Sequence, residues 1–156
     1  NVSDKISNFT SLDFQYMYDK ISSFKSDLEI MRVPKVPCHN DICIYNILLN
    51  DSQELILIDW ERSGNNDPAW DLACLSNSLR LNSEKENIML KLYFCDTKPD
   101  TEMHLRIRLY KPVAEFLTGL WMIFQYANGS SLFSYSEFQK MVAEKLKYTL
   151  RLLEGI

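Results

Sequence analysis

Apolar residues recur every three or four positions along several long stretches of the chain, which is the spacing of one face of an α-helix. This spacing predicts a helix over 12–32 and another over 101–127. Pro112 lies inside the second stretch, where its ring and its missing N–H predict a kink or a break. Pro34 and Pro37 predict extended chain after the first helix.

Capping signals predict further helices. Asp67 followed by Pro68 is an N-cap with proline at the first helical position, which predicts a helix over about 68–81. A serine followed three residues later by glutamate is a capping box. Two such boxes open predicted helices over about 84–95 and 135–153; they are Ser83 with Glu86 and Ser134 with Glu137.

Two short apolar runs predict the β structure. Residues 46–49 and 55–58 flank a polar turn and are expected to pair as a hairpin. The polar segment 62–67 is predicted to be a loop. Together these elements predict a mainly α fold with a small β-hairpin, of the α+β class. It forms one helical domain over 12–156, preceded by a polar lead-in over 1–11.

Composition and charge exclude several classes of protein. The chain has 156 residues, of which 46% are hydrophobic, and this suits one globular domain. The net charge of -4 argues against a nucleic-acid partner, because binders of the phosphate backbone are basic. No apolar run approaches the roughly 18 residues that a membrane span needs.

The four cysteines argue against a zinc site, because they form no C-x-x-C pair. Their wide spacing predicts buried thiols in a reducing compartment, and therefore a cytoplasmic location. They are Cys38, Cys43, Cys74 and Cys95.

A histidine, an aspartate and an asparagine follow one another at the spacing of a kinase catalytic loop, H-x-D-x-x-x-x-N. They are His39, Asp41 and Asn46. In such a loop the aspartate accepts the proton of an attacking hydroxyl, and the asparagine reaches the metal beside the phosphates.

Asp59 directly follows the second predicted strand, where an acid is well placed to hold Mg²⁺ against ATP phosphates. Because a tight turn joins the two strands, Asn46 and Asp59 are expected at the same end of the hairpin. The sequence therefore predicts a shared metal site there.

Ordered segments around these residues resemble a known family. HND-xxxx-NIL, then LIDWE, then DPAWDLA resemble the choline/ethanolamine kinase and aminoglycoside phosphotransferase superfamily. The segment 117–138, LTGLWMIFQYANGSSLFSYSEF, resembles a choline kinase helix that carries aromatic residues of the amine pocket. The resemblance covers residues 33–154 and implies the C-terminal lobe of the protein-kinase-like fold.

The resemblance also implies roles for individual residues. Asp41 would be the catalytic base, and Asn46 and Asp59 would be ligands of Mg²⁺, with ATP as co-substrate. His39 would brace the loop, and Asp71 would accept hydrogen bonds from its backbone. The acceptor would be the hydroxyl of choline or ethanolamine, and the phosphocholine product would decorate lipopolysaccharide in bacteria.

The same resemblance places aromatic residues around the amine, where their faces attract a quaternary ammonium. These are Trp121, Phe133, Tyr135 and Phe138, and their alternative role is plain core packing. Glu61 would contact the substrate or the groups around the metal; its alternative role is a solvent-exposed charge at the end of the strand. Two positions depart from the family pattern: Thr118 stands where a second tryptophan is common, and Ser78 where an acid often supports the amine.

The lobe that covers the phosphates in a kinase has no counterpart in this sequence. G-x-G-x-x-G is absent, and no V-A-I-K-like lysine precedes His39. We therefore expect a kinase C-terminal lobe that lacks its partner lobe, is inactive alone and self-associates through the exposed face. The alternatives are an aminoglycoside- or sugar-type phosphotransferase, and a non-catalytic lobe that binds an amine or a protein partner.

Overall fold

The computed structural model describes residues 14–31, 33–95, 101–129 and 134–156. The chain divides into two compact units. The unit that runs from Ile30 to Lys111 is called the hairpin unit here. The other joins the part up to Glu29 with Pro112–Ile156 and is called the helical unit. The predicted lead-in over 1–11 lies outside the described residues.

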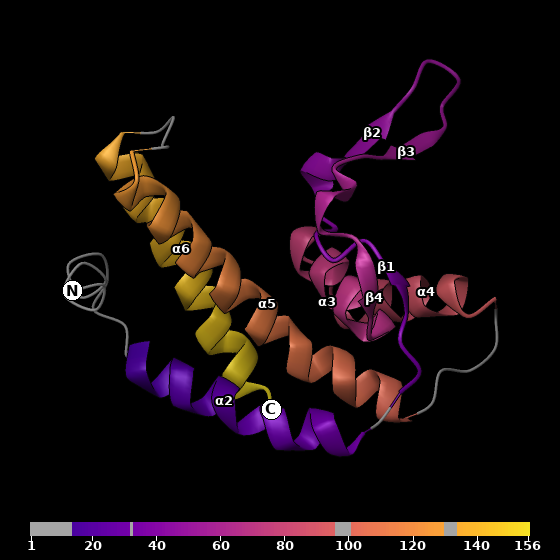
Figure 1. Ribbon diagram of the computed structural model, residues 1–156, viewed down its shortest axis with the longest axis horizontal. Helices are drawn as coiled ribbons and strands as arrows, with labels where there is room; N and C mark the ends of the chain where they lie inside the picture. The colour runs from indigo at the N-terminus through magenta and orange to yellow at the C-terminus, as the bar shows by residue number, and fades with distance from the viewer. Residues whose placement is uncertain (1–13, 32, 96–100, 130–133) are drawn as a thin grey trace. The chain divides into compact units, whose positions relative to one another are not determined.

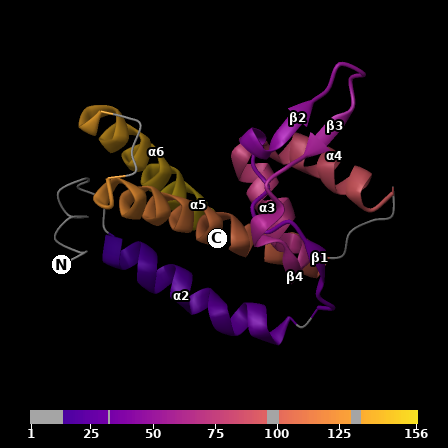
Figure 2. The same ribbon diagram turned by 45° about the horizontal axis from the view of Figure 1, so that its top comes forward.

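The helical unit consists of helices packed through apolar side chains. Helix α2 is Phe14–Ile30, α5 is Thr101–Ala127 and α6 is Tyr135–Glu154. Figures 1 and 2 both show α6 lying along α5. Gly119 of α5 permits this approach, because a Cβ there would already meet the Leu146 side chain at 3.4 Å.

Buried side chains of these helices form the interior of the helical unit. The Phe14 and Phe116 rings, with centroids 4.9 Å apart, join α2 to α5. Glu115 of α5 is buried and pairs with Lys145 of α6 at 3.1 Å, so its charge is compensated. The remaining apolar members include Met17, Phe24, Ile123, Phe138, Val142, Leu146 and Leu153.

Two small antiparallel sheets characterise the hairpin unit. Strand β2 (Ile47–Leu49) pairs with β3 (Leu55–Leu57), which is the predicted hairpin. Strand β1 (Val36–Cys38) pairs with β4 (Gly64–Asn66). Figure 1 shows the β2–β3 hairpin projecting away from the β1–β4 pair.

The helices of the hairpin unit build its core. Helix α3 is Pro68–Ser78 and α4 is Ser83–Tyr93, and the first part of α5 completes the unit. Short 3-10 helices, η1 (Ile44–Asn46) and η2 (Trp60–Arg62), flank the hairpin. The core cluster contains Ala69, Leu72, Ala73, Leu90, Met103 and Ile107.

A buried ion pair lies beside this core. Arg106 Nε is 3.1 Å from Asp67 Oδ2, and both side chains are almost fully buried. Asp67 also caps α3, since its Oδ1 accepts from the Ala69 N–H. Burial, assisted by the charge of Asp67 and a hydrogen bond with it and opposed by the charge of Arg106, raises the pKa of Tyr110 to about 12. The pair therefore anchors the first turn of α3.

Most of the predicted helices and the hairpin are confirmed, but several predictions were wrong. The segment 62–67 contains strand β4 and is not a loop throughout. Helix α5 continues through Pro112, so of the two expected outcomes, a kink or a break, the break does not occur. Ser83 opens no capping box: Asn82 is the N-cap, and Glu86 binds Ser76 and Lys111 instead.

The prediction of four buried thiols was also wrong. No disulfide joins the four cysteines, all of which lie in the described residues; Cys38 is buried, Cys43 and Cys74 are half-buried, and Cys95 is exposed. Burial, assisted by the nearby charge of Asp71, raises the pKa of the Cys38 thiol. Among the residues that the structure describes, no helix is long and apolar enough to cross a membrane.

Candidate active site

Helix α3 supports the segment His39–Asn46, called the 39–46 loop below. The Asp71 carboxylate, in the first turn of α3, accepts two backbone hydrogen bonds from it. The His39 N–H donates to Oδ2 at 2.7 Å, and the Asn40 N–H donates to Oδ1 at 2.9 Å. Both carboxylate oxygens therefore hold the start of the loop, which is the role that the resemblance implied for Asp71.

His39 joins the loop to the strand that leads to Asp59. Its side chain is 2% exposed, with Nδ1 accepting from the Asp41 N–H at 3.3 Å. The ring hydrogen is therefore on Nε2, which donates to the Ile58 carbonyl at 2.8 Å. The ring also packs against Trp60, with centroids 4.7 Å apart. These contacts are structural, as a bracing residue requires.

Hydrogen bonds connect Asn46 to Asp41 and to the residue that precedes Asp59. Its side-chain nitrogen donates to the Asp41 carbonyl at 2.9 Å, which leaves Oδ1 as the amide atom that can ligate a cation. Its own carbonyl accepts from the Ile58 N–H at 2.9 Å. Because Ile58 directly precedes Asp59, these bonds bring the predicted metal ligands to one end of the hairpin.

Asp59 marks a sharp turn of the backbone between β3 and η2. Its φ of 65° lies in the left-handed region, which aspartate tolerates better than most residues. Its side chain does not cap η2, and the residue is exposed. The carboxylate is therefore available at the mouth of the hairpin.

The oxygen donors of Asn46 and Asp59 fit Mg²⁺. This ion is commonly held by one or two protein ligands, with phosphates and waters completing its shell. Within the described ranges, no group of three or more histidine, cysteine, aspartate or glutamate residues could hold a metal ion. The two oxygen donors of Asn46 and Asp59 therefore suit a Mg²⁺ ion that is also bound by the phosphates of a nucleotide.

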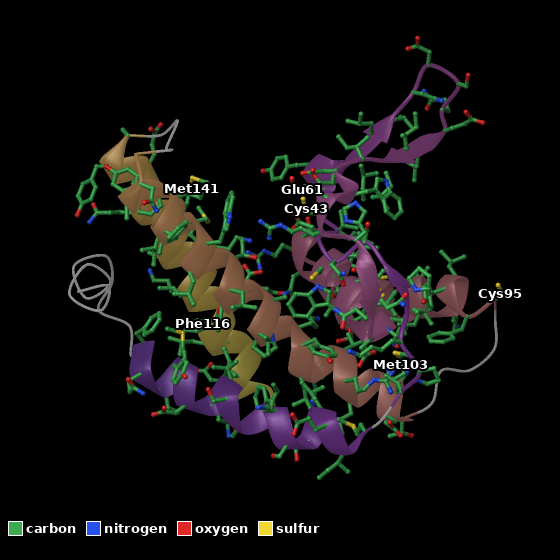
Figure 3. The ribbon with its side chains drawn as sticks, viewed as in Figure 1. Cys43, Glu61, Cys95, Met103, Phe116 and Met141 are labelled. Carbon is green, nitrogen blue, oxygen red and sulfur yellow. The ribbon has the colours of Figure 1, made fainter. Side chains whose placement is uncertain are left out.

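Asp41 faces an arginine that the sequence reasoning missed. Arg62 Nε is 3.8 Å from Asp41 Oδ2 and 3.9 Å from Glu61 Oε1. The Asp41 side chain is 41% exposed, so the pair is weak and its carboxylate is accessible. Figure 3 shows Glu61 and Cys43 at the base of the β2–β3 hairpin. A cation thus lies beside the predicted base.

Asn40 is a second residue that the sequence reasoning missed. Its φ is 65°, and its side chain donates to the Arg62 carbonyl and accepts from Asn66, both at 2.9 Å. Its carbonyl also accepts from the Trp70 indole N–H at 3.2 Å. Asn40 therefore connects the loop to η2, β4 and α3. Its place inside His-Asn-Asp, at a residue type that tolerates positive φ, was the available signal.

The predicted aromatic residues belong to the helical unit and differ from one another. Phe138 is 3% exposed and stacks on Tyr126 with centroids 4.2 Å apart, which is the geometry of core packing. Trp121 and Tyr135 are about half exposed. Phe133 lies outside the described residues. Thr118 donates its hydroxyl to the Ala114 carbonyl at 2.8 Å.

Comparisons with known proteins point to one family. Residues 1–86 match the family described as choline/ethanolamine kinase. Protein LicA of Haemophilus influenzae is 32% identical over 125 residues, which is 77% of this chain and 44% of that protein. This chain therefore spans less than half the length of that relative.

Solved structures show the same fold. A choline/ethanolamine kinase family protein from Mesorhizobium loti matches with a TM-score of 0.78 and 24% identity, covering 98% of this chain and 53% of that one. Choline kinase LicA from Streptococcus pneumoniae matches with a TM-score of 0.75 and 22% identity, covering 99% and 54%. The predicted fold class is confirmed.

Proposed function

The chain belongs to the choline/ethanolamine kinase family, and we propose that the full-length protein transfers the γ-phosphoryl group of ATP to the hydroxyl of choline or ethanolamine. One observation carries the proposal. Asn46 binds the Asp41 carbonyl with its side chain and the Ile58 N–H with its backbone, so the candidate base and the two candidate cation ligands come from the same end of the hairpin.

The residues of this chain divide the chemistry between them. The accessible Asp41 carboxylate accepts a hydrogen bond from the alcohol, orients it and takes its proton as the alcohol oxygen bonds to the γ-phosphorus, the bond from that phosphorus to the β-phosphate oxygen breaks and ADP leaves. Asn46 and Asp59 would hold Mg²⁺, which when bound would neutralise charge on the phosphates. Arg62, 3.8 Å from Asp41, is placed to stabilise negative charge on the transferred group.

In line with the resemblance, Trp121 and Tyr135 are the residues proposed to bind an ammonium group. Both side chains are about half exposed, and an aromatic face attracts a quaternary ammonium that cannot donate hydrogen bonds. The family match favours choline or ethanolamine over an aminoglycoside or sugar acceptor. We extend the proposal to a cytoplasmic enzyme whose phosphocholine decorates lipopolysaccharide, as the resemblance implied.

A substrate panel tests the proposed acceptor. Full-length protein is assayed for ADP release with MgATP and choline, ethanolamine, an aminoglycoside or a hexose. Turnover that depends on choline or ethanolamine supports the proposal. Turnover with the aminoglycoside or hexose alone overturns it, and so does no turnover with any acceptor.

The β2–β3 hairpin and its flanking 3-10 helices expose many large apolar side chains, which another part of the full-length protein could cover. Strands and flanking 3-10 helices present seven large apolar side chains to solvent, namely Ile44, Tyr45, Leu48, Leu49, Leu55, Ile56 and Trp60. Leu48 pairs with Ile56 and Leu49 with Leu55, so both faces of the hairpin expose apolar pairs. So many exposed large apolar side chains in one small element are unusual on a monomer. We propose that the rest of the full-length protein covers it, and that this chain alone self-associates through it and is inactive.

Light scattering on the 156-residue chain tests this part. Leu49 and Leu55 are directly opposite across the hairpin, so Leu49→Lys with Leu55→Lys should reduce the association. Leu92→Lys, at an exposed apolar position of α4, is the matched control and should leave it unchanged. A monomer at all concentrations would contradict the proposal.

A further inference from the structure

Helix α3 holds the 39–46 loop at a second point besides Asp71. Ser78 is the last residue of α3, and its Oγ accepts from the Ile44 N–H at 2.8 Å. Asp71 and Ser78 are seven residues apart, which is about two helical turns, so both lie on one face about 10 Å apart along the axis. Asp41 lies in the segment between the two attachments.

The hydroxyl of Ser78 satisfies the backbone N–H of Ile44 at the start of η1. Ile44 begins η1, and within the described part of the chain the preceding Cys43 does not cap it with its side chain. Ser78 thus acts as a cap supplied from another element. Since Asn46 ends the same 3-10 helix, the position of η1 determines how Asn46 reaches the Asp41 carbonyl and Ile58.

We propose that Ser78 is a positioning residue for phosphoryl transfer. Its hydroxyl holds η1 against α3 and so sets Asn46 relative to Asp41. This inference rests on the proposed function. It differs from a role in supporting the amine, because the hydroxyl is engaged by loop backbone rather than directed to a substrate.

The chemistry of position 78 limits which side chains can do this. Threonine keeps a hydroxyl acceptor, whereas alanine has none. Ile44 is partly exposed, so its N–H can bond to water when the acceptor is removed, and the loss of stability should be small. The expected effect is therefore on loop geometry more than on folding.

Hydrogen exchange of the full-length protein tests the attachment without any assay of activity. In Ser78→Ala the Ile44 amide should exchange about tenfold faster, and Ser78→Thr should restore most of the protection. Ser76→Ala is the matched control, because the Ser76 hydroxyl on the same helix donates to Glu86 instead. Unchanged Ile44 exchange in Ser78→Ala overturns the attachment.

Steady-state kinetics of the full-length protein test the consequence. Ser78→Ala should lower kcat about tenfold and leave KM for MgATP and for the alcohol within about twofold. Ser78→Thr should recover most of kcat, and Ser76→Ala should leave kcat per folded molecule unchanged.

The outcomes separate the two proposals. If the wild-type protein turns over no acceptor, the proposed function fails, and the exchange experiment still decides whether Ser78 holds the loop. If the wild type is active and Ser78→Ala keeps its kcat, the positioning role fails. A raised KM for the amino alcohol alone would assign Ser78 to the amine and overturn the inference.

Discussion

The hairpin unit and the helical unit are each stabilised internally, but by different kinds of interaction. In the hairpin unit, side chains such as Asp71, His39 and Asn40 bind backbone groups that are far away in the sequence. The helical unit is joined mainly by apolar contacts such as those between Phe14 and Phe116. Hydrogen bonds place individual atoms, whereas apolar packing chiefly specifies volume and shape.

This difference explains why the polar and the aromatic residues of the predicted site differ in how the fold holds them. His39, Asp41 and Asn46 of the 39–46 loop each have a defined hydrogen-bond or ion-pair partner in the fold. An aromatic stripe at helical spacing has no such constraint, and its members divide between core and surface: Phe138 is buried, and Trp121 is 48% exposed.

The largest expected effect is on turnover in the hairpin unit. Asp41→Asn in the full-length protein should lower kcat by about 10²–10⁴, because a general base is lost. Stability should change little, since the pair of Asp41 with Arg62 is exposed. The kinetics are compared with urea unfolding of the same variant.

Glu29→Gln is the matched control for Asp41→Asn. Glu29 also pairs at 3.8 Å with an exposed cation, Lys25, but lies in α2 outside the 39–46 loop. Its kcat should equal that of the wild type. Equal losses in both variants would show that surface charge, and not the loop, controls turnover.

Some of this organisation was predictable from local sequence. The β2–β3 hairpin follows from two apolar runs around turn residues, and the capping box of Ser134 with Glu137 is present as predicted. The box at Ser83 failed because Asn82 caps instead and because Ser76 and Lys111 bind Glu86. Tertiary partners overrode a correct local pattern.

Other features depend on contacts between segments that are distant in sequence. Strand β4 has only three residues and begins with Gly64, which is a local signal for a loop, and its strand character depends on pairing with β1. Asn40 gains its role from Arg62, Asn66 and Trp70, which a linear motif does not reveal. Only the folded arrangement shows these partners.

The next expected effect is on stability, at the buried ion pair beneath α3. Arg106→Met in the 156-residue chain should lower the free energy of unfolding by about 3–5 kcal/mol, because the Asp67 carboxylate is left buried without its partner. Lys25→Met, which breaks an exposed pair, should cost about 0–1 kcal/mol. Urea unfolding of both variants checks the contrast; similar losses would contradict it.

A comparable test distinguishes the aromatic residues of the helical unit. Phe138→Ala should destabilise this chain by about 3–5 kcal/mol, because it leaves a cavity beside Tyr126. Trp121→Ala should stay within about 0.5 kcal/mol, as for other exposed positions. Urea unfolding measures both. A larger loss for Trp121 than for Phe138 would reverse their assignment to surface and core.

The smallest expected effect is a pH dependence at Tyr110. Its pKa rises from 10.0 to about 12 on folding, because burial and Asp67 favour the neutral phenol. The stabilisation is therefore complete below pH 10 and is lost as the pH rises toward 12. Urea unfolding at pH 9 and pH 11 should show this loss in the wild type, and less of it in Tyr110→Phe. An equal loss in both would assign it to other groups.

Direct detection of the product tests the central claim, which is that the 39–46 loop and Asp59 carry out phosphoryl transfer to an amino alcohol. Full-length protein is incubated with MgATP and choline or ethanolamine and followed by phosphorus-31 NMR. A phosphomonoester signal should appear with the wild type and with Glu29→Gln, and be absent or greatly slowed with Asp41→Asn. Product formation by Asp41→Asn at the wild-type rate, or none by the wild type with either alcohol, would contradict the account.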